Sequence, residues 1–155
     1  MIFNFIKRFF RQRKIDQYLA EAIDCRGEDP HHSYQLALQA EALELYKAVD
    51  KADVLTLMAH YWQVNMQYDK AEQYYLEADA LDEQLPLNLR GIMKMEIGSF
   101  YDSAHSYERA LAYYEEAERC YVEGDAPYLL RELQMLKADI YDDMGEPVQA
   151  LAMLE

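Results

Sequence analysis

The residues that could carry out chemistry are spread along this sequence and form no recognised catalytic motif. The four histidines are His31, His32, His60 and His105, and none has acidic or cysteine neighbours at the spacing of a metal site. There is no HExxH motif, no glycine-rich phosphate loop and no GxSxG nucleophile motif. We therefore expect that the protein is not an enzyme and that it binds neither a metal nor another cofactor.

The two cysteines, Cys25 and Cys120, lie far apart, and neither belongs to a CxxC pair. This pattern indicates neither a disulfide framework nor a zinc site. Free thiols are typical of a reducing compartment, so we expect the protein in the cytoplasm.

Charge is distributed unevenly along the chain. The net charge is −14, yet residues 1–15 contain five basic side chains and no acidic one. The rest of the chain carries ten basic and 29 acidic side chains, a net charge of −19. An acidic body repels the phosphate backbone, so we expect no nucleic-acid partner. The charge suits a basic protein partner, although it also serves solubility alone.

Length and composition favour a single all-α domain. A chain of 155 residues can bury a sizeable core, and 52% of its residues are hydrophobic, which is too many for a disordered chain. Five glycines and four prolines leave few residues for the turns of a β-protein.

The first 14 residues form an amphipathic segment of helical period. Its polar side has Asn4, Lys7, Arg8, Arg11 and Lys14, and its apolar side has Ile2, Phe3, Phe5, Ile6, Phe9 and Phe10. The segment is too short to cross a bilayer, and its charges follow its apolar residues, unlike those of a signal peptide.

Two interpretations of residues 1–14 remain. It lies on an anionic membrane surface, at the inner face of the membrane, or it packs against the first helical hairpin or a second subunit. We favour packing, because short apolar stripes are usually buried.

Capping signals divide the next part of the chain into helices. Residues 15–25 continue as a helix, and residues 26–32 are predicted to form a loop. Ser33 is the expected N-cap of the next helix, and Asp50 or Asp53 is the expected cap of the one after it.

The segment from Ile97 to Ala117 has the pattern of two antiparallel helices that pack closely. Small residues are set against aromatic rings along it: Gly98, Ala110 and Ala117 against Tyr101, Tyr107 and Tyr114. Where a small side chain lies, the neighbouring helix can approach, and a ring fills the space beside it.

This segment resembles the tetratricopeptide repeat (TPR), in which an apolar-Gly pair and an aromatic residue precede an Ala, aromatic and Ala set on the second helix. The resemblance implies an all-α fold in which antiparallel helix-hairpin repeats stack into a right-handed TPR-like superhelix. It divides the chain into a basic amphipathic helix at 1–14, a degenerate first helical pair at 15–51 and TPR-like repeats over 52–155, at about 52–85, 86–124 and 125–155.

The copies of the repeat depart from the family pattern in two respects. The equivalent alanines Ala71, Ala110 and Ala150 are 39 and 40 residues apart. The usual TPR period is about 34 residues, so we expect helices longer by a turn or more. In addition, Lys94 and Lys137 occupy positions where the family has bulky apolar residues.

In the TPR family, the first helix of each hairpin lines a concave groove. The resemblance places three stripes there, each running i, i+4, i+7 along one helical face. The expected partner-binding residues are Thr56, His60, Gln63, Met95, Ser99, Asp102, Met135, Asp139 and Asp142, with Asp143 beside the last. Such a groove would be polar at one end and acidic at the other.

The resemblance then implies an adaptor or scaffold that binds another protein or peptide, with basic and apolar residues, in an acidic groove. TPR domains that clamp an acidic C-terminus use Lys, Asn and Arg on this face, and these positions are neutral or acidic here, so we expect no such clamp. Two alternatives are a secretion-type chaperone, which compact acidic all-TPR proteins resemble, and a membrane-surface assembly factor anchored by residues 1–14. A homo-oligomer is a further option that the sequence leaves open.

Overall fold

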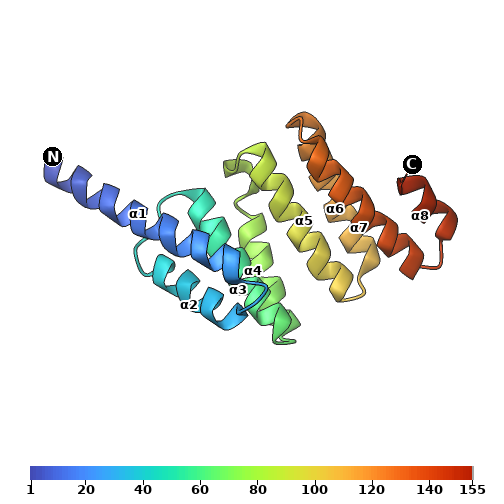
Figure 1. Ribbon diagram of the computed structural model, residues 1–155, viewed down its shortest axis with the longest axis horizontal. Coiled ribbons are helices and arrows are strands. Elements are labelled where there is room, and N and C mark those ends of the chain that lie inside the picture. The colour runs from blue at the N-terminus through green and yellow to red at the C-terminus, as the bar shows by residue number, and fades with distance from the viewer. Residues whose placement is uncertain (155) are drawn as a thin grey trace. The chain divides into compact units, whose positions relative to one another are not determined.

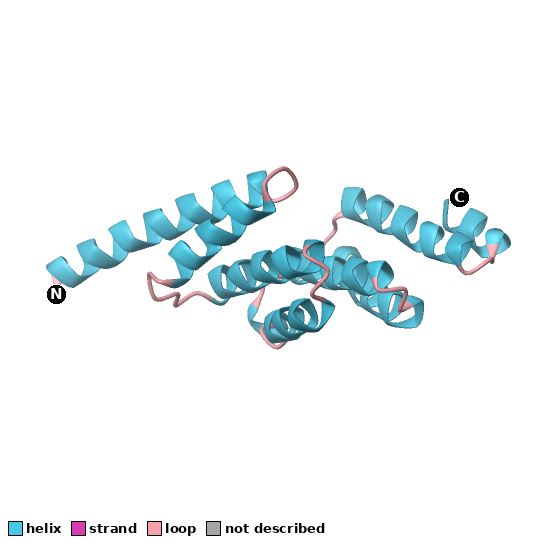
Figure 2. Cartoon of the chain, turned by 90° about the horizontal axis from the view of Figure 1, so that it is seen from below, coloured by secondary structure: helices cyan, strands magenta, loops and turns pink. Residues whose placement is uncertain are grey.

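Every regular element in the described part of the chain is a helix. The computed structural model describes residues 1–154, and this range contains eight α-helices and a short 3₁₀ helix but no strand (Figures 1 and 2). Their bounds are α1 Ile2–Cys25, α2 Pro30–Glu41, α3 Ala48–Val64, α4 Tyr68–Asp79, η1 Asp82–Gln84, α5 Leu87–Ser103, α6 Tyr107–Glu123, α7 Pro127–Asp143 and α8 Pro147–Leu154. The predicted all-α fold class is confirmed.

The chain forms two compact units with four α-helices each. Unit 1 comprises Met1–Gln84 and contains α1 to α4, and unit 2 begins at Leu85 and contains α5 to α8. Within each unit, every helix packs against the next one along the chain. Short connections produce this order, because a turn of a few residues brings the next helix back along the previous one. Packing between sequence neighbours is the arrangement expected of helical repeats.

The second half of α1 builds the core of unit 1. Ile15, Leu19 and Ala22 are buried there with apolar residues of α2 and α3. The buried Gln12 donates a hydrogen bond from Nε2 to Asp50 Oδ2 of α3 at 2.8 Å. This bond lies where the packed part of α1 begins, since none of residues 1–11 is buried.

The first half of α1 lies outside the core. Residues 1–14 continue into residues 15–25 as one helix, as expected, and this helix extends beyond α2 (Figures 1 and 2). Phe3, Phe5, Phe9 and Phe10 are each more than half exposed. The interpretation that these side chains pack against the first hairpin is therefore wrong.

The start of α2 also differs from the prediction. The helix begins at Pro30, and its N-cap is Asp29, whose Oδ1 accepts a hydrogen bond from the His32 backbone N–H at 2.9 Å. Ser33 lies inside the helix, where its hydroxyl donates to the Ala22 carbonyl oxygen of α1 at 2.8 Å. The serine therefore serves a buried contact between helices, which a local capping rule does not detect.

The predicted cap of α3 is wrong for a similar reason. The helix begins after Lys47, so Asp50 and Asp53 both lie within it. Asp50 is buried and accepts the hydrogen bond from Gln12, and thus a tertiary contact determines its position.

The same turn closes the hairpins α3–α4, α5–α6 and α7–α8. One residue in each turn is left-handed: Met66 at φ 61°, His105 at φ 57° and Gly145 at φ 77°. Each donates its N–H to the carbonyl three residues back, and the next residue donates to the carbonyl five residues back. These are the two hydrogen bonds of a Schellman motif. The three turn residues have the same spacing as Ala71, Ala110 and Ala150. The turn between α6 and α7 has the same geometry, with Asp125 at φ 52°, so the repeat is defined by the spacing of the hairpins and not by the turn alone.

In unit 2, α5 and α6 approach closely at two glycines. A Cβ atom at Gly98 would overlap the ring of Tyr114, and one at Gly91 would overlap the ring of Tyr121. Both rings are completely buried. The predicted contact between a small residue and a ring is therefore present at Gly98, and Gly91 adds a second contact of the same kind.

Two lysines at expected apolar positions are buried in unit 2. Lys94 Nζ of α5 lies 2.7 Å from Glu116 Oε2, and Lys137 Nζ of α7 lies 3.0 Å from Glu118 Oε2. Both glutamates belong to α6, so ion pairs connect α6 to a helix on either side. The glutamates compensate for the desolvation of the ammonium groups, which would otherwise be costly.

Replacing Gly98 with leucine should lower the free energy of unfolding by at least about 2–3 kcal/mol, because the new side chain must displace the buried Tyr114 ring. This cost exceeds the gain of about 1 kcal/mol in helix propensity. Chemical denaturation measures the difference. Gly27→Leu is the matched control, since nothing lies within 4 Å of a Cβ atom there. Equal losses in the two variants would contradict the close approach.

Removing the two partners of the Lys137–Glu118 pair should have unequal effects. Glu118→Gln leaves a buried ammonium without its counter-charge and should cost about 1–3 kcal/mol of unfolding free energy. Lys137→Met leaves a glutamate that water can reach, so its effect should stay within about 1 kcal/mol. Denaturation of both variants, with the exposed Glu115→Gln as control, tests this order. The reverse order would show that the pair is not stabilised as described.

Candidate functional site

The α3 stripe of predicted partner-binding residues takes part in internal contacts of unit 1. Thr56 is buried, and its hydroxyl donates to a carbonyl oxygen of its own helix at 3.1 Å. Gln63 Oε1 accepts a hydrogen bond from the Tyr75 hydroxyl of α4 at 3.0 Å. His60 is half-buried, and burial, helped by the charge of Arg26, lowers the pKa of its imidazole. At neutral pH this stripe therefore presents little exposed charge.

The α5 stripe combines packing contacts with a partly accessible carboxylate. The Tyr121 hydroxyl lies 3.8 Å from Met95 Sδ, and the Tyr114 hydroxyl lies 3.1 Å from Ser99 Oγ. Asp102, one turn further along the helix, is half-buried. The rings that separate α5 from α6 thus reach the same side of α5 as the predicted site.

The α7 stripe is open to solvent. Met135, Asp139, Asp142 and Asp143 are all exposed, and α7 contacts α5 within unit 2. Asp102, Asp139, Asp142 and Asp143, together with Met135, are named the acidic face below.

Neighbouring negative charges affect the ionisation of Asp102 on the acidic face. Burial raises the pKa of the Asp102 carboxyl, and the negative charges of Asp143 and Asp139 raise it further, while His105 opposes the change. Among residues 1–154, no basic side chain forms an ion pair with these three aspartates. The charges of Asp139 and Asp143 therefore act on the Asp102 carboxyl within unit 2, and the wider groove stays a prediction.

The same negative field reaches the buried tyrosine beneath this surface. Burial is the main cause that raises the pKa of Tyr114 to about 12, and the charges of Asp102 and Asp139 also raise it. The hydrogen bond between the Tyr114 and Ser99 hydroxyls acts in the opposite direction. Tyr114 therefore keeps its proton at physiological pH and packs as a neutral side chain.

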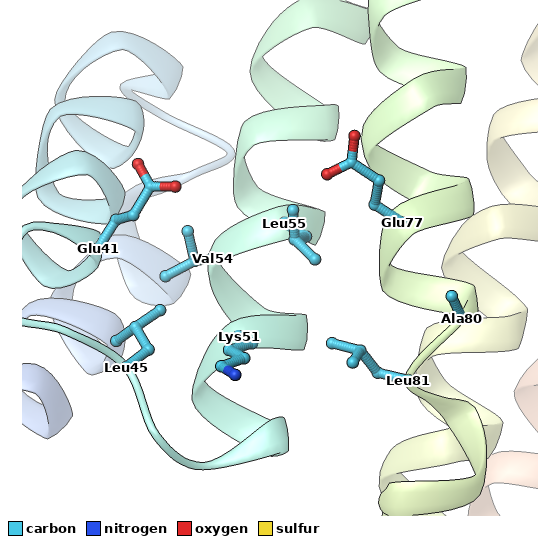
Figure 3. A pocket seen from close by; sticks show the side chains of 8 residues that line it. All are labelled: Glu41, Leu45, Lys51, Val54, Leu55, Glu77, Ala80 and Leu81. Carbon is cyan, nitrogen blue, oxygen red and sulfur yellow. The ribbon is translucent and has the colours of Figure 1, made fainter.

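Unit 1 contains an open pocket that the sequence did not predict (Figure 3). It has a volume of about 530 Å³ and lies among residues of α2, α3, α4 and their loops: Glu41, Leu45, Lys51, Val54, Leu55, Glu77, Ala80 and Leu81. The lining is mainly apolar, and the side chains of Glu41 and Glu77 lie on opposite sides of Leu55. An apolar side chain flanked by cations would fit this environment.

Helical periodicity could not reveal this pocket completely. Leu45 and Leu81 lie in loops, outside any helical stripe. The repeat pattern assigns Leu55 to the packed stripe of its helix and Thr56 to the groove, so it gave no signal that Leu55 lines a pocket. The buried Thr56 and the partly exposed Leu55 show that α3 is rotated from the orientation implied by the predicted stripe.

The potentially reactive side chains are engaged in structural contacts. His32 Nε2 lies 3.0 Å from Glu21 Oε1, and His105 Nδ1 lies 3.0 Å from the Tyr107 hydroxyl. Burial raises the pKa of the Cys25 and Cys120 thiols, which disfavours the nucleophilic thiolate. Within residues 1–154, no three His, Cys, Asp or Glu side chains converge as metal ligands. The described surfaces are suited to charge and apolar contacts.

No protein-family model, curated protein or solved structure matches this chain. Nor does any helix in residues 1–154 combine the length and hydrophobicity needed to cross a membrane.

Asp102→Asn should raise the melting temperature at pH 7 by roughly 1–4 °C. The folded-state pKa of Asp102 lies above its unfolded value, so the ionised carboxylate destabilises the fold as pH rises through the folded pKa. Below the unfolded pKa, near about 4, both side chains are neutral and the gain should vanish. Thermal unfolding at pH 7 and pH 3 measures the effect, with the exposed Asp142→Asn as control. A gain of equal size at pH 3 would exclude an electrostatic cause.

Proposed function

We propose that this protein is a non-enzymatic interaction module of TPR type, an adaptor or scaffold that binds a segment of another protein. The observation that carries the proposal is the acidic face, where Asp102 is half-buried beside Asp139 and Asp143 against its own tendency to ionise. If stability of the fold were the only requirement, a neutral residue in place of one of these aspartates would be favoured, because it would remove the repulsion. Unfavourable electrostatic repulsion that persists in a folded protein is typical of a binding surface.

The repeated hairpin supports the same proposal. Three hairpins share one turn geometry, and the small residues Ala71, Ala110 and Ala150 are buried at equivalent positions of their second helices. Helical-repeat proteins of this kind present side chains of successive first helices to a partner. Asp102 of α5 and Asp139 of α7 lie on two such helices within unit 2.

The partner segment should carry basic and apolar residues. Lysine or arginine would neutralise the aspartates, and such complementarity acts mainly on the association rate and its salt dependence. Met135, which is 56% exposed, supplies a flexible apolar contact beside the charges. An acidic partner would be repelled by the same surface.

A secretion-type chaperone is the second candidate, and the unit 1 pocket favours it. A chaperone of this type holds an apolar segment of its client, and the pocket offers Leu45, Val54, Leu55 and Leu81 for such contacts. We place either activity in the cytoplasm, because Cys25 and Cys120 are free thiols, which suit a reducing compartment.

The acidic face can be tested with a synthetic amphipathic peptide of leucine and lysine and its leucine–glutamate counterpart. The lysine peptide should bind the wild-type protein, and the glutamate peptide should not. The double variant D139K/D142K should weaken binding of the lysine peptide roughly tenfold at low salt. It should leave unfolding free energy within about 0.5 kcal/mol, because both side chains are exposed. Fluorescence anisotropy at several salt concentrations measures the affinity.

The matched control is E115K/E123K, which changes the net charge equally at two exposed positions of α6. Glu118 is unsuitable for this purpose, because it pairs with the buried Lys137. Equal weakening by both double variants would show that total charge, and not the acidic face, attracts the peptide. Unchanged binding in both would place the binding site elsewhere.

A further inference from the structure

The first half of α1 exposes a large apolar surface that unit 1 leaves uncovered. Phe3 is 67% exposed and Phe5 is 72% exposed, and Ile2, Phe9 and Phe10 are each more than half exposed. Isolated apolar residues on a surface need no explanation, but a contiguous group of aromatic side chains marks an interaction site.

The orientation of α1 accounts for this exposure. Successive residues of an α-helix are about 100° apart around its axis. On that basis, the centre of the apolar stripe of residues 2–10 lies roughly 140° from that of the buried stripe formed by Gln12, Ile15, Leu19 and Ala22. One continuous helix cannot turn both stripes toward the same core. While the second half of α1 stays packed, the phenylalanines of the first half must face away from the rest of unit 1.

Two arginines hold the helix in this orientation. The Arg8 guanidinium carbon lies 4.1 Å from the centre of the Tyr46 ring, and Arg11 Nη1 lies 2.9 Å from Glu44 Oε2. Tyr46 and Glu44 belong to the loop between α2 and α3. These contacts occupy the side of α1 that faces the α2–α3 loop. The opposite side of α1, which has the phenylalanines, stays accessible to a partner.

Three further cations border the apolar stripe. Lys7 Nζ lies 4.5 Å from the centre of the Phe3 ring, and the Arg13 guanidinium carbon lies 5.9 Å from that of Phe9. Lys14 is exposed beside them. Long basic side chains in such positions can keep their charge in a polar layer while the rings enter an apolar one.

We propose that residues 1–14 dock in the plane of an anionic lipid membrane surface. The exposed phenylalanines enter the boundary between headgroups and acyl chains, and Lys7, Arg13 and Lys14 contact lipid phosphates. A helix with aromatic residues on one face and Lys or Arg on the other has the properties of an interfacial helix. This membrane contact is separate from the protein-binding function of the acidic face.

Charge favours lipid over a second copy of this chain. Pairing two such helices would bring together ten basic side chains and no acidic one, counting residues 1–15 of both copies. Like charges beside a helix interface disfavour pairing. An anionic surface converts the same charges into attraction, because basic groups near it gain energy from the surface potential.

Co-sedimentation with vesicles of phosphatidylcholine, with and without phosphatidylglycerol, tests the proposal. The wild-type protein should pellet with the anionic vesicles, should not pellet with the neutral ones, and should be released by high salt. Phe3→Ser with Phe5→Ser should reduce the apparent affinity more than about tenfold, because two large apolar groups no longer enter the bilayer. The matched control is Val122→Ser with Tyr128→Ser, at side chains that are 64% and 72% exposed on unit 2. It should bind like the wild type.

A second pair of variants tests the charges. Lys7→Glu with Lys14→Glu should weaken binding to anionic vesicles roughly tenfold. Arg119→Glu with Arg131→Glu changes the net charge equally at exposed positions of α6 and α7 and should have a much smaller effect. Circular dichroism should show unchanged helix content and melting temperature in all four double variants, because every replaced side chain is exposed.

Two results would overturn the proposal. The first is the absence of binding to anionic vesicles, and the second is vesicle binding that is equally strong in the Phe3/Phe5 variant. If no vesicle binds and analytical ultracentrifugation shows a wild-type dimer that dissociates in the Phe3/Phe5 variant, the apolar stripe would be assigned to a second copy of the chain.

Discussion

The contact between tyrosine rings and glycines of the facing helix determines both the packing and the candidate site of unit 2. Tyr114 occupies the space that a side chain at Gly98 would fill, and Tyr121 does the same at Gly91. Because the rings lie against bare backbone, the Tyr114 hydroxyl reaches Ser99, the residue that follows Gly98 in α5. Close packing and the position of the acidic face are therefore consequences of the same contact. A larger residue at either glycine would separate α5 from α6 and move the residues beside Asp102.

Sequence alone predicted the features that depend on local signals. The alternation of small and aromatic residues identified the close contact at Gly98, and the spacing of equivalent alanines located the hairpins α3–α4, α5–α6 and α7–α8. The turns at Met66, His105 and Gly145 share a Schellman geometry that belongs to each helix end itself. The influence of the α7 aspartates on Asp102 of α5 is consistent with this regularity. If hairpins repeat, equivalent faces of successive first helices lie side by side.

Features that depend on tertiary partners were not predictable in this way. Ser33 and Asp50 have the composition of helix caps, but each forms a hydrogen bond to or from α1 inside the core of unit 1. The first half of α1 has the pattern of a packed helix, and only the direction of the second, buried stripe shows that its phenylalanines face outward. Lys94 and Lys137 look like breaks in an apolar pattern until their glutamate partners on α6 are known. In each case a residue distant in the sequence decides the outcome.

If the acidic face binds a cationic partner as proposed, that binding is coupled to protonation of Asp102. Burial and two neighbouring carboxylates raise the pKa of Asp102, so its ionised form is disfavoured in the unbound protein. A cationic partner at this surface favours the ionised form and therefore lowers that pKa. By thermodynamic linkage, a partner that lowers the pKa must bind the deprotonated protein more tightly, and its affinity must fall as pH decreases through the pKa of Asp102. The repulsion among these carboxylates lowers the stability of the unbound protein. The same carboxylates give the acidic face its highest affinity for a cation when Asp102 is ionised. A face evolved only for solubility would spread these carboxylates apart, because separation would keep their charge and avoid the penalty.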